Sequence, residues 1–233
     1  MFRPDIVPQV LPIPGGGVCL VFDDILLEPD RWRSRAAEFG EQFEPPKHNA
    51  YPGRELRLPD TVTAALLGTV SPWLRRHFGI ARIVDGYTRL SMVTLAPEQL
   101  TPAQSLCHRD RLQAKPGMLP LASVLYLFDD PSLGGTHFFR PLVDDANLTR
   151  LLVDSNRTEA EPFFRQYGIA RGYMTDSNAY FDKVLTVPAR RNRMIVYPGM
   201  KFHSGDIGRP EALTDDPLTG RLTFNGFFTG AMA

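Results

Sequence analysis

The sequence contains little cysteine and no excess of charge of either sign. Cys19 and Cys107 are the only cysteines in 233 residues, so a disulfide framework is excluded and a reducing, cytoplasmic location is expected. Lysine plus arginine and aspartate plus glutamate number 26 each. This balance gives no reason to expect nucleic acid or an anionic membrane as a partner.

Long apolar runs and internal repeats are absent as well. No stretch approaches about eighteen consecutive apolar residues, so no membrane span is expected. The first residues, MFRPD, lack the basic and apolar regions of a secretory signal. With 43% hydrophobic and 22% charged residues, the composition is that of one folded domain with a proper core.

What the chain does have is proline and glycine, at 21 and 19 residues, spread along its whole length. This spread favours many short strands joined by turns over a helical bundle. Runs rich in β-branched and aromatic residues predict the strands. They lie at residues 18–22, 87–95, 121–128, 136–141, 183–187, 194–197 and 221–229.

Helical spacing of apolar residues is confined to three segments. Two of them, residues 29–43 and 60–78, precede most of the strands, and a third is expected at 159–167. The chain is therefore predicted to be a single α+β domain. An N-terminal helical layer, about 18–82, would support a β-roll core at about 83–229, and an insertion at about 148–181 would interrupt the core.

Two ligand-type side chains, His108 and Asp110, stand two residues apart and would share one face of an extended strand. His203 follows a predicted strand far downstream. Two imidazoles and one carboxylate can occupy one face of an Fe(II) ion and leave positions open for substrate and oxygen. Taken alone, each motif is also explained without a metal. The His-x-Asp pair could be a solvated pair in a surface turn, and His203 could be a histidine packed at the end of a strand.

Arg221 opens the last predicted strand, and alternation places it on the same face as Thr223. An arginine inside a β-roll is costly unless it is paired, and a carboxylate would satisfy its guanidinium fork. The alternative is a solvated arginine at the mouth of the roll, or one paired with Asp215 or Asp216.

The chain carries a series of short motifs whose order resembles that of the Fe(II)- and 2-oxoglutarate-dependent dioxygenases of the prolyl-hydroxylase-like kind. The resemblance extends over roughly residues 18–228. The resemblance is carried by FDDIL at 22–26, HRD at 108–110, VLYL at 124–127, GGTHFFRP at 134–141, PGMKFHSG at 198–205 and RLTFN at 221–225.

The resemblance implies a double-stranded β-helix (jelly-roll) core that uses O2 as oxidant. His108, Asp110 and His203 would bind Fe(II). Arg221, helped by Thr223, would pair with the distal carboxylate of the cosubstrate 2-oxoglutarate. Tyr126 would add a hydrogen bond to that carboxylate, or would be a core tyrosine. An acid at position 110 favours hydroxylation over halogenation, because halogenating members have a small residue there.

The expected substrate is a small molecule, an amino acid or a peptidyl side chain. Within the insertion, Tyr173, Asn178 and Tyr180 are candidates to shape its pocket, and Arg140 is a candidate for the pocket mouth. Two other classes stay open: a non-catalytic β-roll scaffold, and a cupin-like metalloenzyme without 2-oxoglutarate. The oligomeric state is open between a monomer and a homodimer.

Overall fold

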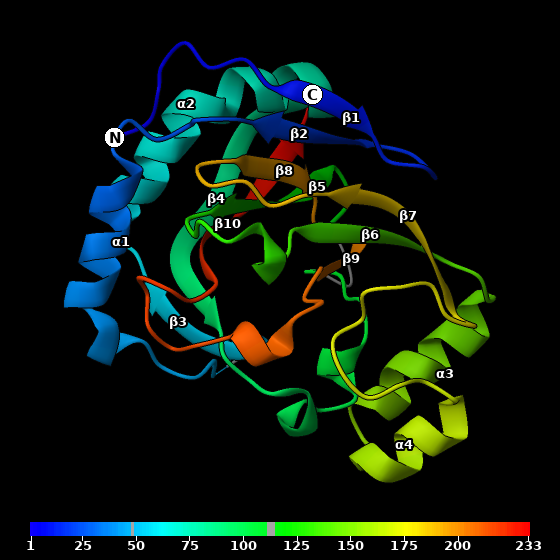
Figure 1. The fold of residues 1–233 in the computed structure, drawn as a ribbon. Coiled ribbons are helices and arrows are strands. Elements are labelled where there is room, and N and C mark those ends of the chain that lie inside the picture. The colour runs from blue at the N-terminus through cyan, green and yellow to red at the C-terminus, as the bar shows by residue number, and fades with distance from the viewer. Residues whose placement is uncertain (48, 111–114) are drawn as a thin grey trace.

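Two antiparallel sheets form the body of the protein (Figure 1). The computed structural model describes residues 1–47, 49–110 and 115–233. The large sheet has the strand order β1-β2-β8-β5-β10-β4-β3, and the small sheet has the order β7-β6-β9. The strands are β1 (Gln9–Pro12), β2 (Val18–Phe22), β3 (Gly53–Arg57), β4 (Ile80–Val93), β5 (Met118–Tyr126), β6 (Thr136–Pro141), β7 (Phe181–Val187), β8 (Met194–Pro198), β9 (Phe202–Gly205) and β10 (Leu222–Met232).

From β4 onward the chain passes repeatedly between the two sheets. β4 and β5 lie in the large sheet, and between them His108 forms a β-bridge with His203 of β9 in the small sheet. The chain then enters the small sheet with β6 and β7, returns with β8, crosses again with β9 and ends with β10. This alternation is the winding of a double-stranded β-helix, which confirms the fold class predicted from the sequence.

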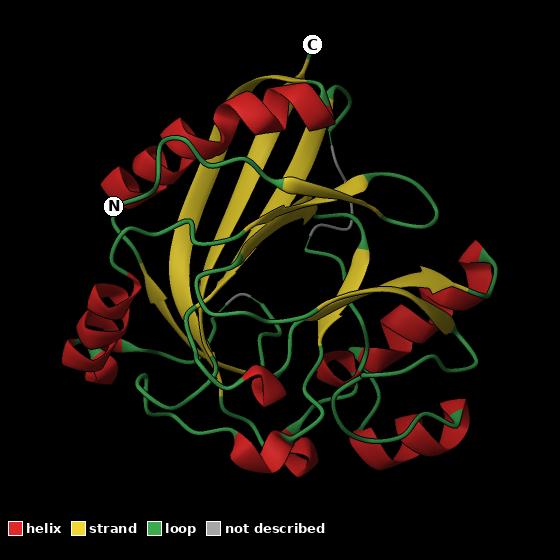
Figure 2. Cartoon of the chain, turned by 45° about the horizontal axis from the view of Figure 1, so that its top comes forward, coloured by secondary structure: helices red, strands yellow, loops and turns green. Residues whose placement is uncertain are grey.

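Helices cover the outer faces of both sheets, as Figure 2 shows. In α2, Leu66, Val70 and Leu74 recur at helical spacing and are fully buried. They belong to one apolar cluster with Leu90 of β4 and Phe224 of β10. The helices are α1 (Pro29–Glu38), α2 (Asp60–Phe78), α3 (Asp145–Ser155) and α4 (Ala160–Tyr167), with 3-10 turns at Gly40–Gln42, Pro97–Gln99, Ala103–Ser105, Pro131–Leu133 and Pro210–Ala212.

The insertion between β6 and β7 contains two helices where the sequence predicted one. The unpredicted helix, α3, begins where the carboxylate of Asp144 accepts a hydrogen bond from the backbone N–H of Asn147 at 2.8 Å. Leu148 and Leu151 of α3 pack with Phe163 of α4 and Phe202 of β9. The insertion therefore supports the strand that carries His203.

Other boundaries differ from the prediction as well, among them those of the first helix and of β4. The first helix ends at Glu38, five residues early, and a 3-10 turn at Gly40–Gln42 takes up the remainder. β4 begins at Ile80, directly after α2, because it pairs along its whole length with the long strand β10. None of the helices in the described ranges has the length and apolar character needed to cross a bilayer.

Candidate metal centre

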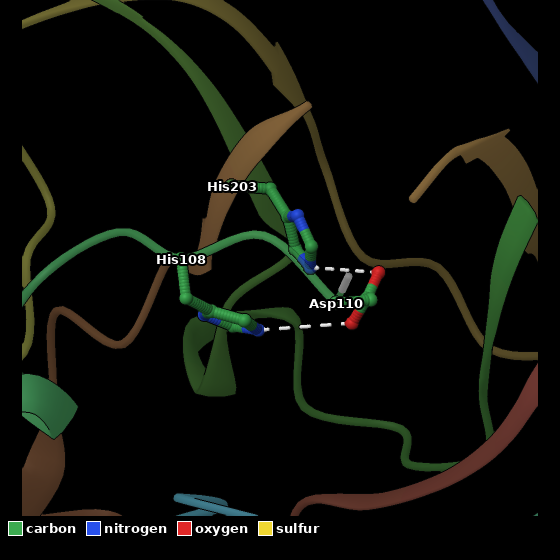
Figure 3. A group of neighbouring side chains, drawn as sticks. All are labelled: His108, Asp110 and His203. Atoms are coloured by element: carbon green, nitrogen blue, oxygen red, sulfur yellow. Dashed lines mark ion pairs between the residues drawn. The ribbon is translucent and has the colours of Figure 1, made fainter. Parts of the chain in front are cut away.

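The three predicted ligands, His108, Asp110 and His203, come together in space (Figure 3). His108 and His203 exchange two backbone hydrogen bonds of 2.9 Å, and the N–H of Asp110 donates to the carbonyl of Gly199 at 2.9 Å. Nε2 of His203 lies 3.6 Å from Oδ2 of Asp110, and Nε2 of His108 lies 3.9 Å from Oδ1. All three candidate ligand atoms are within 4.8 Å of one another. The backbone pairing therefore fixes the spacing of the side chains.

The protonation of the imidazoles suits metal binding. Nδ1 of His203 lies 2.8 Å from the carbonyl oxygen of Lys201, so this nitrogen carries the proton and donates it, which leaves Nε2 as the acceptor. Burial lowers the pKa of His203 to about 4. The ring of His108 is 57% exposed on the cavity side, yet its pKa is also lowered, first by the surrounding protein and then by His203. Both rings are neutral at pH 7, the form that coordinates a metal.

A cavity of about 570 Å³ opens beside the three side chains. This volume is within the range of small-molecule sites. Among the residues that line it are His108, Asp110, His203, Arg221, Thr223 and Tyr173. The cavity thus joins the candidate metal ligands to the candidate cosubstrate residues.

Arg221 stands at the start of β10, with only 4% of its surface exposed. Its Nε donates to the carbonyl of Leu133 at 2.8 Å, and its Nη2 donates to the carbonyls of Gly134 and Gly135 at 3.1 and 3.0 Å. These bonds hold the guanidinium in place from behind. Nη1 makes no hydrogen bond to the described residues, so it is the nitrogen most available to a carboxylate.

Thr223 and Tyr126 differ in their access to the cavity. The hydroxyl of Thr223 donates to the carbonyl of Ser91 at 3.3 Å, and Thr223 lines the cavity. Tyr126 is fully buried, and its hydroxyl lies 2.8 Å from that of Thr136. Thr136 lines the cavity and Tyr126 is not among the lining residues described. The packing of Tyr126 corresponds to the core tyrosine that the sequence left open as an alternative.

Of the insertion residues considered, Tyr173 lines the cavity, and its hydroxyl donates to the carbonyl of Leu95 at 2.6 Å. Asn178 and Tyr180 are not among the described lining residues. Arg140 is not among them either, and it pairs instead with Asp182 at 2.8 Å. The mouth of the cavity is therefore built by other segments.

Tyr51 and Arg89 are among the lining residues that the sequence analysis did not identify. Tyr51 precedes β3 in a segment that shows no periodic pattern, so nothing in the sequence pointed to it. Arg89 stands two residues from both Tyr87 and Ser91 on β4, so the three side chains share one face of the strand. A charged residue on the inward face of a strand is a sequence signal that could have indicated a site.

The fold and the site together define a double-stranded β-helix protein with a candidate two-histidine, one-carboxylate metal centre. The chain matches the model of a family of unknown function (DUF6445) over residues 4–228, and it belongs to that family. A search of curated proteins found no match.

Several solved structures resemble the chain at low identity. A Pseudomonas putida prolyl-4-hydroxylase is 15% identical, with 90% of this chain and 91% of that chain covered and a TM-score of 0.45. HygX from Streptomyces hygroscopicus, with nickel and 2-oxoglutarate bound, is 12% identical, with 91% and 82% covered and a TM-score of 0.48. The carbocyclase SnoK from nogalamycin biosynthesis is 14% identical, with 91% and 79% covered and a TM-score of 0.49. At these values, the likenesses assign no role to any residue here.

Proposed function

We propose that this protein is an Fe(II)- and 2-oxoglutarate-dependent oxygenase that hydroxylates an unactivated C–H bond of a small molecule, an amino acid or a peptidyl side chain. The observation that carries the proposal is the convergence of His108, Asp110 and His203 at one edge of a cavity that also contains Arg221. Two neutral imidazoles and a carboxylate on one face are the donor set of non-haem Fe(II) oxygenases.

The donor set fits a ferrous ion in both charge and orientation. The acceptor nitrogen of His203 is set by its bond to the Lys201 carbonyl, and Asp110 supplies the one anionic ligand. When bound, iron with 2-oxoglutarate supplies the oxidation of a C–H bond by O2, with release of succinate and carbon dioxide. The protein positions the substrate and limits the access of water.

Arg221 and Thr223 are proposed to hold the distal carboxylate of 2-oxoglutarate. Both line the same cavity as the triad, and Arg221 is held by three backbone carbonyls. A cation fixed in this way loses little further freedom when it binds an anion.

Replacing Arg221 with alanine is expected to raise the KM for 2-oxoglutarate about ten- to a hundredfold, because a charge-assisted pair contributes about 1.5–3 kcal/mol. The measurement is succinate formation against 2-oxoglutarate concentration. Arg140→Ala is the matched control, since Arg140 is exposed and paired with Asp182. An unchanged KM in Arg221→Ala protein that still unfolds cooperatively would remove Arg221 from the site.

The proposal itself is tested with Fe(II) and 2-oxoglutarate in the absence of oxygen. The wild-type protein is expected to develop a weak visible charge-transfer band, and Asp110→Ala is expected to lose it, because that variant lacks the anionic ligand. A scaffold protein would show no band and no metal binding. A cupin-like metalloenzyme would bind the metal, and its spectrum would not respond to the oxo acid.

A further inference from the structure

One wall of the cavity contains buried polar atoms that make no hydrogen bond to the described residues. They are Nε of Arg89, the hydroxyl of Ser91 and Oδ1 of Asn225. Tyr51, Arg89 and Asn225 line the cavity, and Ser91 stands two residues beyond Arg89 on β4. Because folded proteins pair nearly all buried polar groups, such a cluster indicates that a polar ligand completes the wall.

The sheet register makes these residues neighbours. Arg89 of β4 is directly opposite Asn225 of β10, and Ser91 is opposite Thr223. Tyr51 covers this part of the wall, with the guanidinium carbon of Arg89 5.3 Å from the centre of its ring. The wall is therefore one continuous polar surface on the inner face of the large sheet.

Arg89 is the charged group at the centre of this wall. Its side chain is 8% exposed, and its Nη1 donates to Glu55, whose other carboxylate oxygen accepts from Asn49 at 2.8 Å. The guanidinium carbon also lies 4.8 Å from the ring centre of Phe227. Glu55 and the two rings hold the guanidinium in place, and its Nε makes no hydrogen bond to the residues that the structure describes.

The charges in the cavity favour a second anion beside the oxo acid. Among the described residues, the guanidinium groups of Arg89, Arg109 and Arg221 and the carboxylate of Asp110 line the cavity. The charge of a ferrous ion would be balanced by the two carboxylates of 2-oxoglutarate. The carboxylates of Asp110 and Glu55 balance two of the three guanidinium charges, so one positive charge is left over. A cavity with a positive excess attracts anionic ligands.

We propose that Arg89 binds a carboxylate of the substrate, so that the substrates of this protein are small carboxylic acids with an apolar body. The inference rests on the proposed function, and it names the substrate class for the same cavity. The apolar body is inferred from the lining rings of Tyr51, Tyr87 and Phe227. A volume of about 570 Å³ has room for such an acid beside 2-oxoglutarate.

Three probes of similar shape and different charge test the proposal: phenylacetate, phenylacetamide and phenethylamine. Binding is measured calorimetrically under nitrogen to protein loaded with Fe(II) and saturating 2-oxoglutarate, so that the metal and Arg221 are already occupied. A parallel series uses the metal-free protein. The wild-type protein is expected to bind the acid at least about tenfold more tightly than the amide, and the amine most weakly.

The variants locate the source of this preference. Arg89→Met is expected to weaken binding of the acid about ten- to a hundredfold and to leave binding of the amide unchanged. Because that change leaves Glu55 unpaired, the double variant Glu55→Gln with Arg89→Gln is measured in parallel. Arg82→Met is the matched control, since Arg82 lies on the same strand and is exposed.

The remaining outcomes distinguish a failure of the substrate inference from a failure of the proposed function. Equal binding of acid and amide by the wild-type protein would overturn it, as would an acid preference that survives both Arg89 variants. If the Arg89 variants lose 2-oxoglutarate and Arg221→Ala keeps it, the wall holds the cosubstrate; the substrate inference then fails and the proposed function stands. If the wild-type protein binds neither Fe(II) nor 2-oxoglutarate, the proposed function fails, and the metal-free series decides the role of Arg89.

Discussion

Replacing His203 with alanine is expected to abolish Fe(II) binding and 2-oxoglutarate turnover. The ring of His203 is 6% exposed, and its Nε2 is aimed at the position it would share with His108 and Asp110. Loss of a group that merely orients a metal ligand costs about ten- to a hundredfold in affinity, so loss of a ligand should cost more than about a hundredfold. Fe(II) titration under nitrogen and an assay for succinate measure the two effects.

The matched control is His77→Ala. His77 lies in the last turn of α2 and stacks on Trp73, away from the cavity. This variant should bind iron as the wild-type protein does. Undiminished iron binding by His203→Ala protein would show that the metal centre is not built from the three residues assigned to it.

Replacing Gly134 with alanine is expected to lower the free energy of unfolding by more than about 4 kcal/mol. A Cβ atom at this position would lie 1.4 Å from the carbonyl oxygen of Asp206, and the φ of Gly134 is +83°. The turn cannot shift freely to relieve the clash, because the carbonyl of Gly134 accepts a hydrogen bond from Arg221. Urea unfolding followed by circular dichroism measures the loss.

Gly168→Ala separates the clash from the backbone strain. Gly168 ends α4 with a φ of +60°, and no atom of the described part of the chain lies within 4 Å of its Cβ position. Left-handed backbone alone costs an alanine about 1–2 kcal/mol, so this variant should lose only that much. Equal losses at the two positions would mean that the contact with Asp206 does not constrain the fold.

The elements that the sequence predicted best are those with a strong local pattern. The helix at Asp60–Phe78 and the strands at Val18–Phe22 and Thr136–Pro141 have the bounds expected from their apolar spacing and flanking turn residues. The helix at Asp145–Ser155 was missed although Leu148, Leu151 and Leu152 recur in it at helical spacing. The same leucines pack in one apolar cluster with residues of α4 and β9.

For the candidate site too, the sequence predicted the residue types, and the tertiary structure fixed how they lie relative to one another. His108, Asp110, His203 and Arg221 could be selected from the sequence because each belongs to a short motif, and the motifs stand in a consistent order. Their spacing in three dimensions depends on the bridge between His108 and His203, which joins residues far apart in the chain.

The sequence by itself determined the class of fold and the kinds of side chain available for chemistry, because alternation, helical spacing and ligand types are properties of neighbouring residues. Only the tertiary structure decided which of those side chains share a cavity. It turned Arg89 and Tyr51 inward, placed Tyr126 in the core and held Arg221 against three carbonyls. The physical reason is that strand register and sheet pairing connect distant segments, and no local pattern specifies that pairing.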